Sequence, residues 1–208
     1  MSKAIIIRPG ETDFDQQSRI QGGLDLPLSE AGQRQVREMI DRLHNLEIDV
    51  VYASPTEPAL STGREVADAL DVSFKELDGL ENLSHGLWEG MCLEDVRRKH
   101  PRVYKQWRDS PVAVCPPEGE TCSEAFERVQ RALKKPSRRR QPFAVVASEP
   151  LATLIASVLR GHDPALPGPV CGCTDQNRIE VIESVEPVNG RSWPARNGLD
   201  REGAERAS

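Results

Sequence analysis

The sequence has no long apolar run and few aromatic residues, at 4% of the total. No stretch of about 18 apolar residues is present to span a bilayer, and the N-terminus lacks the apolar core of a signal peptide. The net charge of −6 argues against a general nucleic-acid or membrane-surface role. We therefore expect a cytoplasmic protein that associates with neither nucleic acid nor membranes.

The cysteines do not form the pattern of a disulfide framework. They are odd in number and lack paired spacing, at Cys92, Cys115, Cys122, Cys171 and Cys173. This pattern favours reduced thiols in a reducing compartment. Cys171 and Cys173 lack a second cysteine pair or a nearby histidine that would complete a tetrahedral metal site, so we interpret them as loop thiols. We expect neither a metal nor another cofactor.

What is present indicates one domain followed by a polar tail. The chain has 208 residues, of which 38% are hydrophobic, enough for one substantial core. We place this single domain at residues 1–183. Residues 184–208 are rich in Pro, Gly, Arg, Asn and Ser without periodicity, and we expect them to be loosely ordered.

Short apolar runs alternate with amphipathic segments along the chain. Strands are predicted at residues 4–7, 50–53, 143–147 and 178–182, and helices from about 29 to 46, 58 to 70 and 151 to 159. This alternation predicts an α/β fold, a three-layer α/β/α sandwich with a largely parallel sheet. In a sheet of this kind a crevice forms outside the carboxyl ends of the strands, and we expect a functional site there.

A longer polar segment, residues 80–135, separates the second helix from the third strand and carries two predicted helices, at 93–100 and 123–135. It is followed by the one basic cluster, residues 134–140. We interpret this cluster as a solvated loop; a phosphate-rich partner is the alternative.

Several motifs occur in the order found in one known family. They begin with Arg8-Pro9-Gly10-Glu11-Thr12 and continue with Arg19-Ile20-Gln21-Gly22, Asp25 and Pro27-Leu28, Ala53-Ser54-Pro55, Gly86-Leu87-Trp88-Glu89-Gly90 and Pro117-Glu118-Gly119-Glu120-Thr121. The chain resembles the phosphoglycerate-mutase-like branch of the histidine phosphatase superfamily. The resemblance implies a phosphoglycerate-mutase-like sandwich with residues 80–135 as a small helical cap over the site, and makes a homodimer reasonable.

The same resemblance implies a phosphate site built from two arginines, two histidines and a carboxylic acid. Carried over by position, the nucleophilic histidine falls at Pro9, whose ring nitrogen has no lone pair to offer. The second arginine falls at Pro58, the general acid at Asn82 and the second histidine at Ser148. Of this set only Arg8 is retained.

Acidic residues accompany these replacements. The asparagine that closes the family's first motif is Asp15 here, and Glu57 and Glu149 flank the replaced positions Pro58 and Ser148. A pocket that is cationic in the resembled family is therefore expected to be neutral or anionic, and to suit a neutral or cationic ligand. A phosphate bound tightly beside Arg8 would count against this prediction.

His85 is the one histidine expected near the pocket, because it precedes the Gly86–Gly90 turn and lies close to Asn82 in sequence. It is a possible substitute nucleophile, as is Ser148, but a replacement needs in-line access and a paired base, and neither is visible in the sequence.

We therefore predict a pseudoenzyme with a binding or regulatory role toward an unidentified protein or small-molecule ligand. The alternative is a low-activity or altered phosphatase that acts on phosphate monoesters through a non-standard nucleophile. A decaying paralogue without a selected role is a third interpretation.

Overall fold

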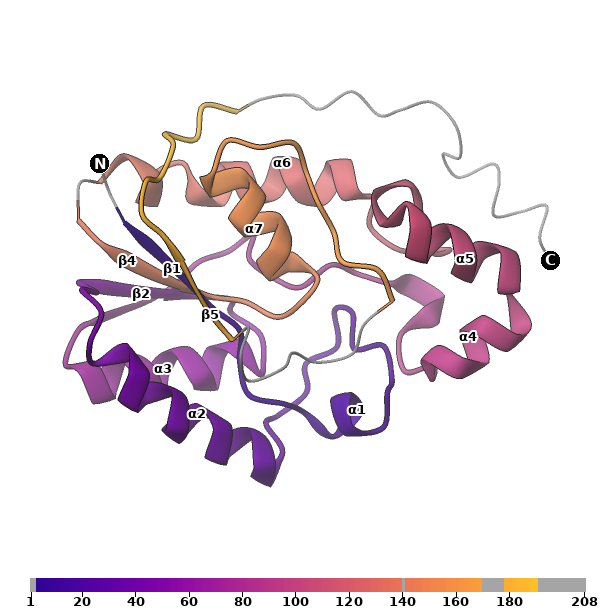
Figure 1. Cartoon of the computed structure of the whole chain (residues 1–208), viewed down its shortest axis with the longest axis horizontal. Coiled ribbons are helices and arrows are strands. Elements are labelled where there is room, and N and C mark those ends of the chain that lie inside the picture. The colour runs from indigo at the N-terminus through magenta and orange to yellow at the C-terminus, as the bar shows by residue number, and fades with distance from the viewer. Residues whose placement is uncertain (1–2, 140, 170–177, 191–208) are drawn as a thin grey trace.

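A five-stranded sheet lies at the centre of the computed structural model, which describes residues 3–139, 141–169 and 178–190 (Figure 1). Its strands are β1 (Ala4–Ile7), β2 (Val50–Ala53), β3 (Ser73–Glu76), β4 (Phe143–Val146) and β5 (Ile179–Ile182), in the order β3-β2-β4-β1-β5. All neighbours pair in parallel except β5, which is antiparallel to β1. The predicted largely parallel sheet is confirmed.

Helices cover both faces of the sheet. The helices α2 (Glu30–Leu43) and α3 (Ala59–Leu70) lie on one face, and α6 (Cys122–Leu133) and α7 (Leu151–Leu159) lie on the other (Figure 1). Successive strand residues point to opposite faces, so that Ile5 and Ile7 pack toward α2 and α3, whereas Ala4 and Ile6 pack toward α6 and α7. These two cores give the three-layer α/β/α sandwich expected from the sequence.

The helix boundaries follow from local sequence. The Ser29 hydroxyl accepts a hydrogen bond from the Gly32 N–H and so caps α2. Thr121 and Glu124 form a capping box at the start of α6, in which each side chain accepts from the other's backbone N–H. The helix α7 is almost wholly buried because its residues are apolar on nearly all sides.

A small cap stands beside the sandwich. It contains α4 (Leu93–Lys99), α5 (Pro101–Asp109) and the short 3₁₀ turns η1 (Gly86–Trp88) and η2 (Pro111–Ala113). Its own core joins Trp88 and Trp107, whose ring centroids are 5.4 Å apart, with Val96 and with Ile20 from the loop that follows β1. The remaining short elements are α1 (Asp13–Gln16) and η3 (Pro136–Arg138).

The structure corrects three expectations. The helix α6 was assigned to the cap, but Ala125, Phe126 and Val129 pack in the core that faces α7, so the cap is smaller than residues 80–135. The helix α5 is absent from the prediction, in which the cap helix ends at His100 and no helix follows. Pro101 instead opens a second helix, at a first-turn position where proline is tolerated. The edge strand β3 was also missed, because it is short and mostly exposed.

The first residues of the predicted loose tail are packed against the sandwich. Val185 and Val188 are buried in the same core as α7, and the Glu186 N–H donates to the Leu159 carbonyl. Residues 184–190 are therefore packed, and the rest of the predicted tail lies outside the described residues. Across the described part of the chain, no helix has the length and apolar character needed to cross a membrane. The cytoplasmic location stays a prediction.

Candidate functional site

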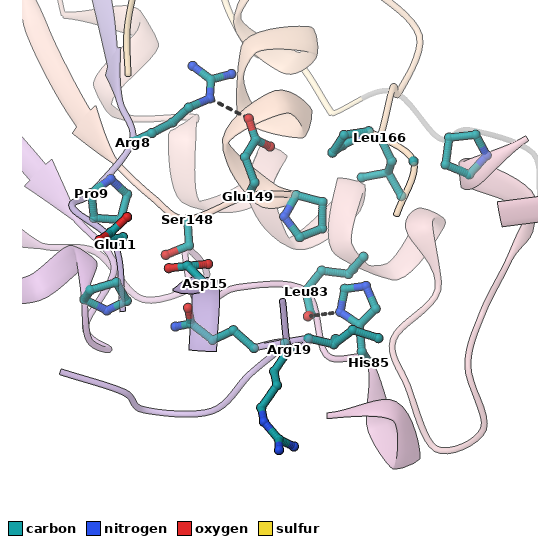
Figure 2. Close-up of a pocket in the computed structure, with 18 of the residues that line it drawn as sticks. Arg8, Pro9, Glu11, Asp15, Arg19, Leu83, His85, Ser148, Glu149 and Leu166 are labelled. Carbon is teal, nitrogen blue, oxygen red and sulfur yellow. Dashed lines mark hydrogen bonds and ion pairs between the residues drawn. The ribbon is translucent and has the colours of Figure 1, made fainter. Parts of the chain in front are cut away.

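A pocket lies at the carboxyl ends of β1 and β4, between the sheet and the cap (Figure 2). Its volume is about 890 Å³, part of it open to solvent. Of the residues predicted for the site, the structure brings Arg8, Pro9, Asp15, Pro58, His85, Ser148 and Glu149 into the lining of this one pocket. The crevice expected from the parallel sheet is therefore present.

Arg8 directly follows β1, and its guanidinium is held by two carboxylates. Its Nε donates to Glu149 Oε1 at 2.5 Å, and its Nη2 donates to Glu180 Oε2 at 3.0 Å. The Arg8 side chain extends away from Asp15 and Ser148 toward Glu149 (Figure 2). Burial alone would lower the pKa of Arg8, but the charges and hydrogen bonds of Glu149 and Glu180 outweigh it and raise the pKa.

The network continues from Glu180 to Arg160. Glu180 lies on β5, and its Oε1 accepts from Arg160 Nη1 at 2.7 Å, at the end of α7. Burial opposes ionisation of Glu180, but the hydrogen bonds from Arg160 and Arg8 dominate and lower its pKa. Two carboxylates and two guanidiniums thus link β1, α7 and β5 beside the pocket.

Glu149 also holds the start of α7. Its carboxylate accepts from the Thr153 N–H at 3.2 Å and from the Thr153 hydroxyl at 2.9 Å. Its backbone carbonyl accepts from Asn82 Nδ2 at 3.0 Å. This carboxylate is therefore engaged on one side by Arg8 and on the other by the first turn of a buried helix.

Asp15 lines the pocket and also caps α1. Its Oδ2 accepts from the Thr12 N–H at 2.7 Å and from the Thr12 hydroxyl at 3.0 Å, and the Asp15 N–H donates back to that hydroxyl. This is a capping box, which accounts for an acidic residue here without any catalytic role.

Glu57 and Asn82 do not line the pocket. The Glu57 carboxylate turns toward α3, where it accepts from the Ser61 hydroxyl at 2.5 Å and from the Ser61 N–H at 3.1 Å. Asn82 spans two loops, because its Oδ1 accepts from the Leu83 N–H at 2.9 Å while its Nδ2 binds Glu149. The expectation that Glu57 contributes charge to the pocket is therefore wrong, because the side chain caps a helix instead.

His85 is 7% exposed and stands on the cap side of the pocket. Its Nδ1 donates to the Leu83 carbonyl at 3.1 Å, so Nε2 carries the lone pair of the ring. Burial lowers the pKa of His85, and the Leu83 bond and the Glu89 charge offset this only in part. The imidazole is therefore neutral at pH 7.

Sequence reasoning missed Arg178, which is 4% exposed and lines the pocket directly before β5. It donates to the Pro9 carbonyl and, at 2.8 Å, to Gln35 Oε1, and so holds the backbone at the replaced nucleophile position. Glu180 and Arg160 were missed as well. One signal could have pointed to Arg178 and Glu180. Both are charged residues within the otherwise apolar segment 178–182, which is predicted as a strand.

The retained motifs hold the walls of the pocket. Glu89 Oε1 accepts from the backbone N–H groups of Gly23 and His85, each at 2.9 Å, and so joins the first loop to the cap. A side chain at Gly22, where φ is +58°, would place its Cβ 2.4 Å from Glu89 Oε1. These motif residues therefore serve the fold.

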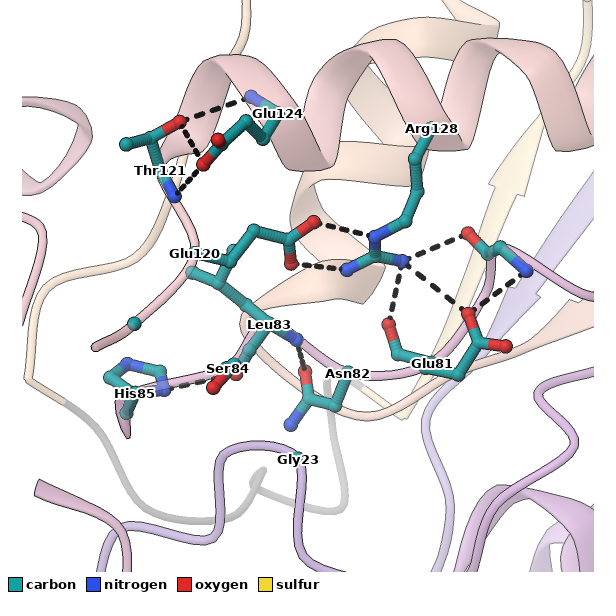
Figure 3. Close-up of polar contacts among 12 residues, drawn as sticks. Gly23, Glu81, Asn82, Leu83, Ser84, His85, Glu120, Thr121, Glu124 and Arg128 are labelled. Carbon is teal, nitrogen blue, oxygen red and sulfur yellow. Dashed lines mark hydrogen bonds and ion pairs between the residues drawn. The ribbon is translucent and has the colours of Figure 1, made fainter. Parts of the chain in front are cut away.

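Arg128 on α6 fastens the segment that leads to His85 (Figure 3). It donates to both carboxylate oxygens of Glu120, at 2.6 and 2.5 Å, and to the carbonyls of Gly79 and Glu81, each at 2.9 Å. A bidentate pair of this kind fixes geometry as well as adding stability. The loop that carries Asn82 and His85 is therefore anchored to the core of the sandwich.

Within the described residues, no group of three or more His, Cys, Asp or Glu side chains is arranged to hold a metal ion. Cys171 and Cys173 lie outside the described part of the chain.

Comparisons with known proteins agree with this architecture. A family model described as "Histidine phosphatase superfamily (branch 1)" matches residues 4–181. Phosphoserine phosphatase 1 of Hydrogenobacter thermophilus is 32% identical over 146 residues, which make up 70% of this chain and 69% of that protein. The uncharacterized phosphatase PhoE of Bacillus subtilis is 27% identical over 169 residues, 80% of this chain and 81% of that one. A mycobacterial glucosyl-3-phosphoglycerate phosphatase superimposes with a TM-score of 0.73 at 21% identity, over 91% of this chain and 100% of that one.

Proposed function

The chain belongs to the histidine phosphatase superfamily, and from this premise we propose that it is a member without phosphoryl-transfer activity that acts by binding a ligand or a partner. The observation that carries the proposal is the state of Arg8, the one retained member of the phosphate site. Both Glu149 and Glu180 accept hydrogen bonds from its guanidinium. A phosphate that approached Arg8 would meet the negative charge of both carboxylates.

The neighbouring positions support the same proposal. Pro9 stands where the resembled family has its nucleophile, and a peptide-bound ring nitrogen cannot attack phosphorus. Pro58 and Ser148 line the pocket where a guanidinium and an imidazole would be expected, and neither can replace the charge of the group it stands for. Asn82 uses both ends of its amide to hold backbone groups.

One observation favours the alternative, an altered phosphatase. His85 is a neutral imidazole that lines the pocket with the lone pair on Nε2, which is the protonation state that a nucleophile or general base requires. The relatives above are named as phosphatases, one of them for phosphoserine. Against this alternative, Arg8 is held by carboxylates, whereas phosphoryl transfer depends on cations that offset the charge of the phosphoryl group.

The two proposals differ in a hydrolysis assay. Purified protein is incubated with p-nitrophenyl phosphate and with O-phosphoserine from acidic to alkaline pH, beside Arg8→Ala and His85→Gln variants prepared in the same way. We expect the three proteins to show the same background rate. Turnover by the wild type that is lost in both variants would establish the alternative, whereas loss in neither would indicate a contaminating phosphatase.

A further inference from the structure

The polar groups of the pocket show which ligand chemistry it suits, provided that the proposed binding role holds. Three guanidiniums line it, but their donors are directed to the protein. Arg8 binds Glu149 and Glu180, and Arg178 binds the Pro9 carbonyl and Gln35. Arg19 donates to the Gly90 carbonyl at 2.6 Å and to Gln17 at 2.9 Å.

The hydrogen-bond acceptors that line the pocket have fewer partners in the protein than the guanidinium donors have. His85 is more than nine-tenths buried, and its Nε2 has no hydrogen-bond partner among the residues that the structure describes. Because Nδ1 carries the ring proton, Nε2 can only accept. Since His85 lines the pocket, Nε2 can accept a hydrogen bond from a donor on a ligand there.

Two carboxylates add further acceptor capacity. Glu11 accepts through Oε1 from Gln16 at 2.8 Å, and Asp15 accepts through Oδ2 from Thr12. Within the described part of the chain, the second oxygen of each has no hydrogen-bond partner, and both residues line the pocket with Ser148. Neither carboxylate forms an ion pair with a described cation, in contrast to Glu149.

The rest of the lining is largely apolar. Leu83, Leu166 and Trp107 lie on the wall toward the cap, and Trp107 is 5.6 Å from His85 between ring centroids. Proline rings add to the apolar lining at Pro111, Pro116, Pro150 and Pro167. Apolar walls with a few placed polar groups are the usual composition of a small-molecule site.

We propose that the pocket binds a small organic amine, with its ammonium group between Glu11 and Asp15 and its apolar body against Trp107 and the proline rings. A donor on the ligand satisfies His85 Nε2. This ligand class is opposite in charge to a phosphate ester, and it names the binding partner that the proposed function leaves open.

The test compares three probes that share one apolar body and differ in charge. Phenethylamine, 2-phenylethanol and phenyl phosphate are each titrated into the ¹⁵N-labelled full-length protein, and the indole N–H signal of Trp107, assigned with a Trp107→Phe variant, reports on the pocket. We expect phenethylamine to bind with a dissociation constant on the order of millimolar, as usual for a fragment of this size, and more tightly than either other probe. Glu11→Gln should weaken the binding of the amine by about two- to fivefold, as expected for one partly exposed charge pair.

The matched control is Glu127→Gln, at an exposed position on α6, which should leave amine binding unchanged. Equal binding of the amine and the alcohol, equal binding to wild type and to Glu11→Gln, or no response to any probe would overturn the proposal. Tighter binding of phenyl phosphate without hydrolysis would overturn the ligand class but leave the inactive-member proposal in place. Hydrolysis of phenyl phosphate, dependent on Arg8, would overturn the proposed function itself.

Discussion

Replacing Glu149 by methionine removes the carboxylate that holds Arg8 while keeping a side chain of similar length. The side chains of Arg8 and Glu149 are only 9% and 13% exposed, so the variant takes this carboxylate from a buried guanidinium, although the bond to Glu180 remains. Breaking a buried pair costs about 3–5 kcal/mol when no other partner remains. Glu180 reduces this cost, but the Thr153 N–H at the start of α7 also loses its acceptor, which is worth about 1 kcal/mol.

We therefore expect Glu149→Met to lower the free energy of unfolding by about 3 kcal/mol. The assay is urea unfolding followed by far-ultraviolet circular dichroism. The control Glu127→Met, at an exposed position on α6, should stay within about 0.5 kcal/mol of the wild type.

A double variant separates charge burial from packing. In Arg8→Met/Glu149→Met no guanidinium remains to be compensated, so we expect it to recover at least half of the loss, since apolar replacements of buried ion pairs are often neutral or stabilising. A Glu149→Met protein as stable as the Glu127→Met control would show that Arg8 does not depend on Glu149 for its burial.

Three further predictions concern Glu180, Arg128 and Cys122. The pKa of Glu180 lies below its ordinary value of 4.5 in the folded protein. The ionised Glu180 therefore contributes fully to stability above pH 4.5, and this contribution is lost as the pH falls through the folded-state pKa. In Glu180→Gln, the free energy of unfolding should fall less steeply with decreasing pH in this acid range. Arg128→Met should cost about 2–4 kcal/mol in urea unfolding, since it removes a bidentate pair and two bonds to carbonyls, whereas Arg131→Met on the exposed side of α6 should cost less than about 0.5 kcal/mol. Burial, with a smaller effect of the Glu120 charge, raises the pKa of Cys122 to about 12, so iodoacetamide at mildly alkaline pH should modify this thiol only after unfolding. Modification mapped to Cys122 in the folded protein would contradict its burial, whereas modification of the partly exposed Cys92 and Cys115 would not.

Much of the fold was predictable because it rests on short-range patterns. The runs at β1, β2 and β4 are continuously apolar, as in strands buried on both faces, and Ser29 gave a capping signal for α2. The strand β3 could not be recognised, because an exposed edge strand needs only one apolar residue, here Phe74. The position of α6 in the main sandwich depends on which layer its apolar face meets, and its amphipathic pattern alone does not show this.

Site residues that directly follow a strand could be predicted from the sequence. Site residues that are joined only by contacts between distant segments could not. Arg8, Pro9 and Ser148 meet in one pocket because β1 and β4 are parallel neighbours. The Glu57 side chain was expected in the pocket because Glu57 precedes Pro58 in the sequence. Sequence position does not show whether the side chain turns into the pocket or, as here, caps α3. Arg178 lies directly before the antiparallel strand β5 and Glu180 lies on it. The Arg178–Pro9 contact spans 169 positions of the sequence and the Arg8–Glu180 contact spans 172, so local patterns do not show either.

We propose that the pocket has no group that accepts a phosphoryl group. This proposal is tested most directly by mixing the protein, in excess, with p-nitrophenyl phosphate, quenching in alkali, and measuring both nitrophenol release and the intact mass of the protein. We predict no release above that of the Arg8→Ala variant and no added phosphoryl mass. Stoichiometric release with a phosphoryl adduct mapped to His85 would contradict the account.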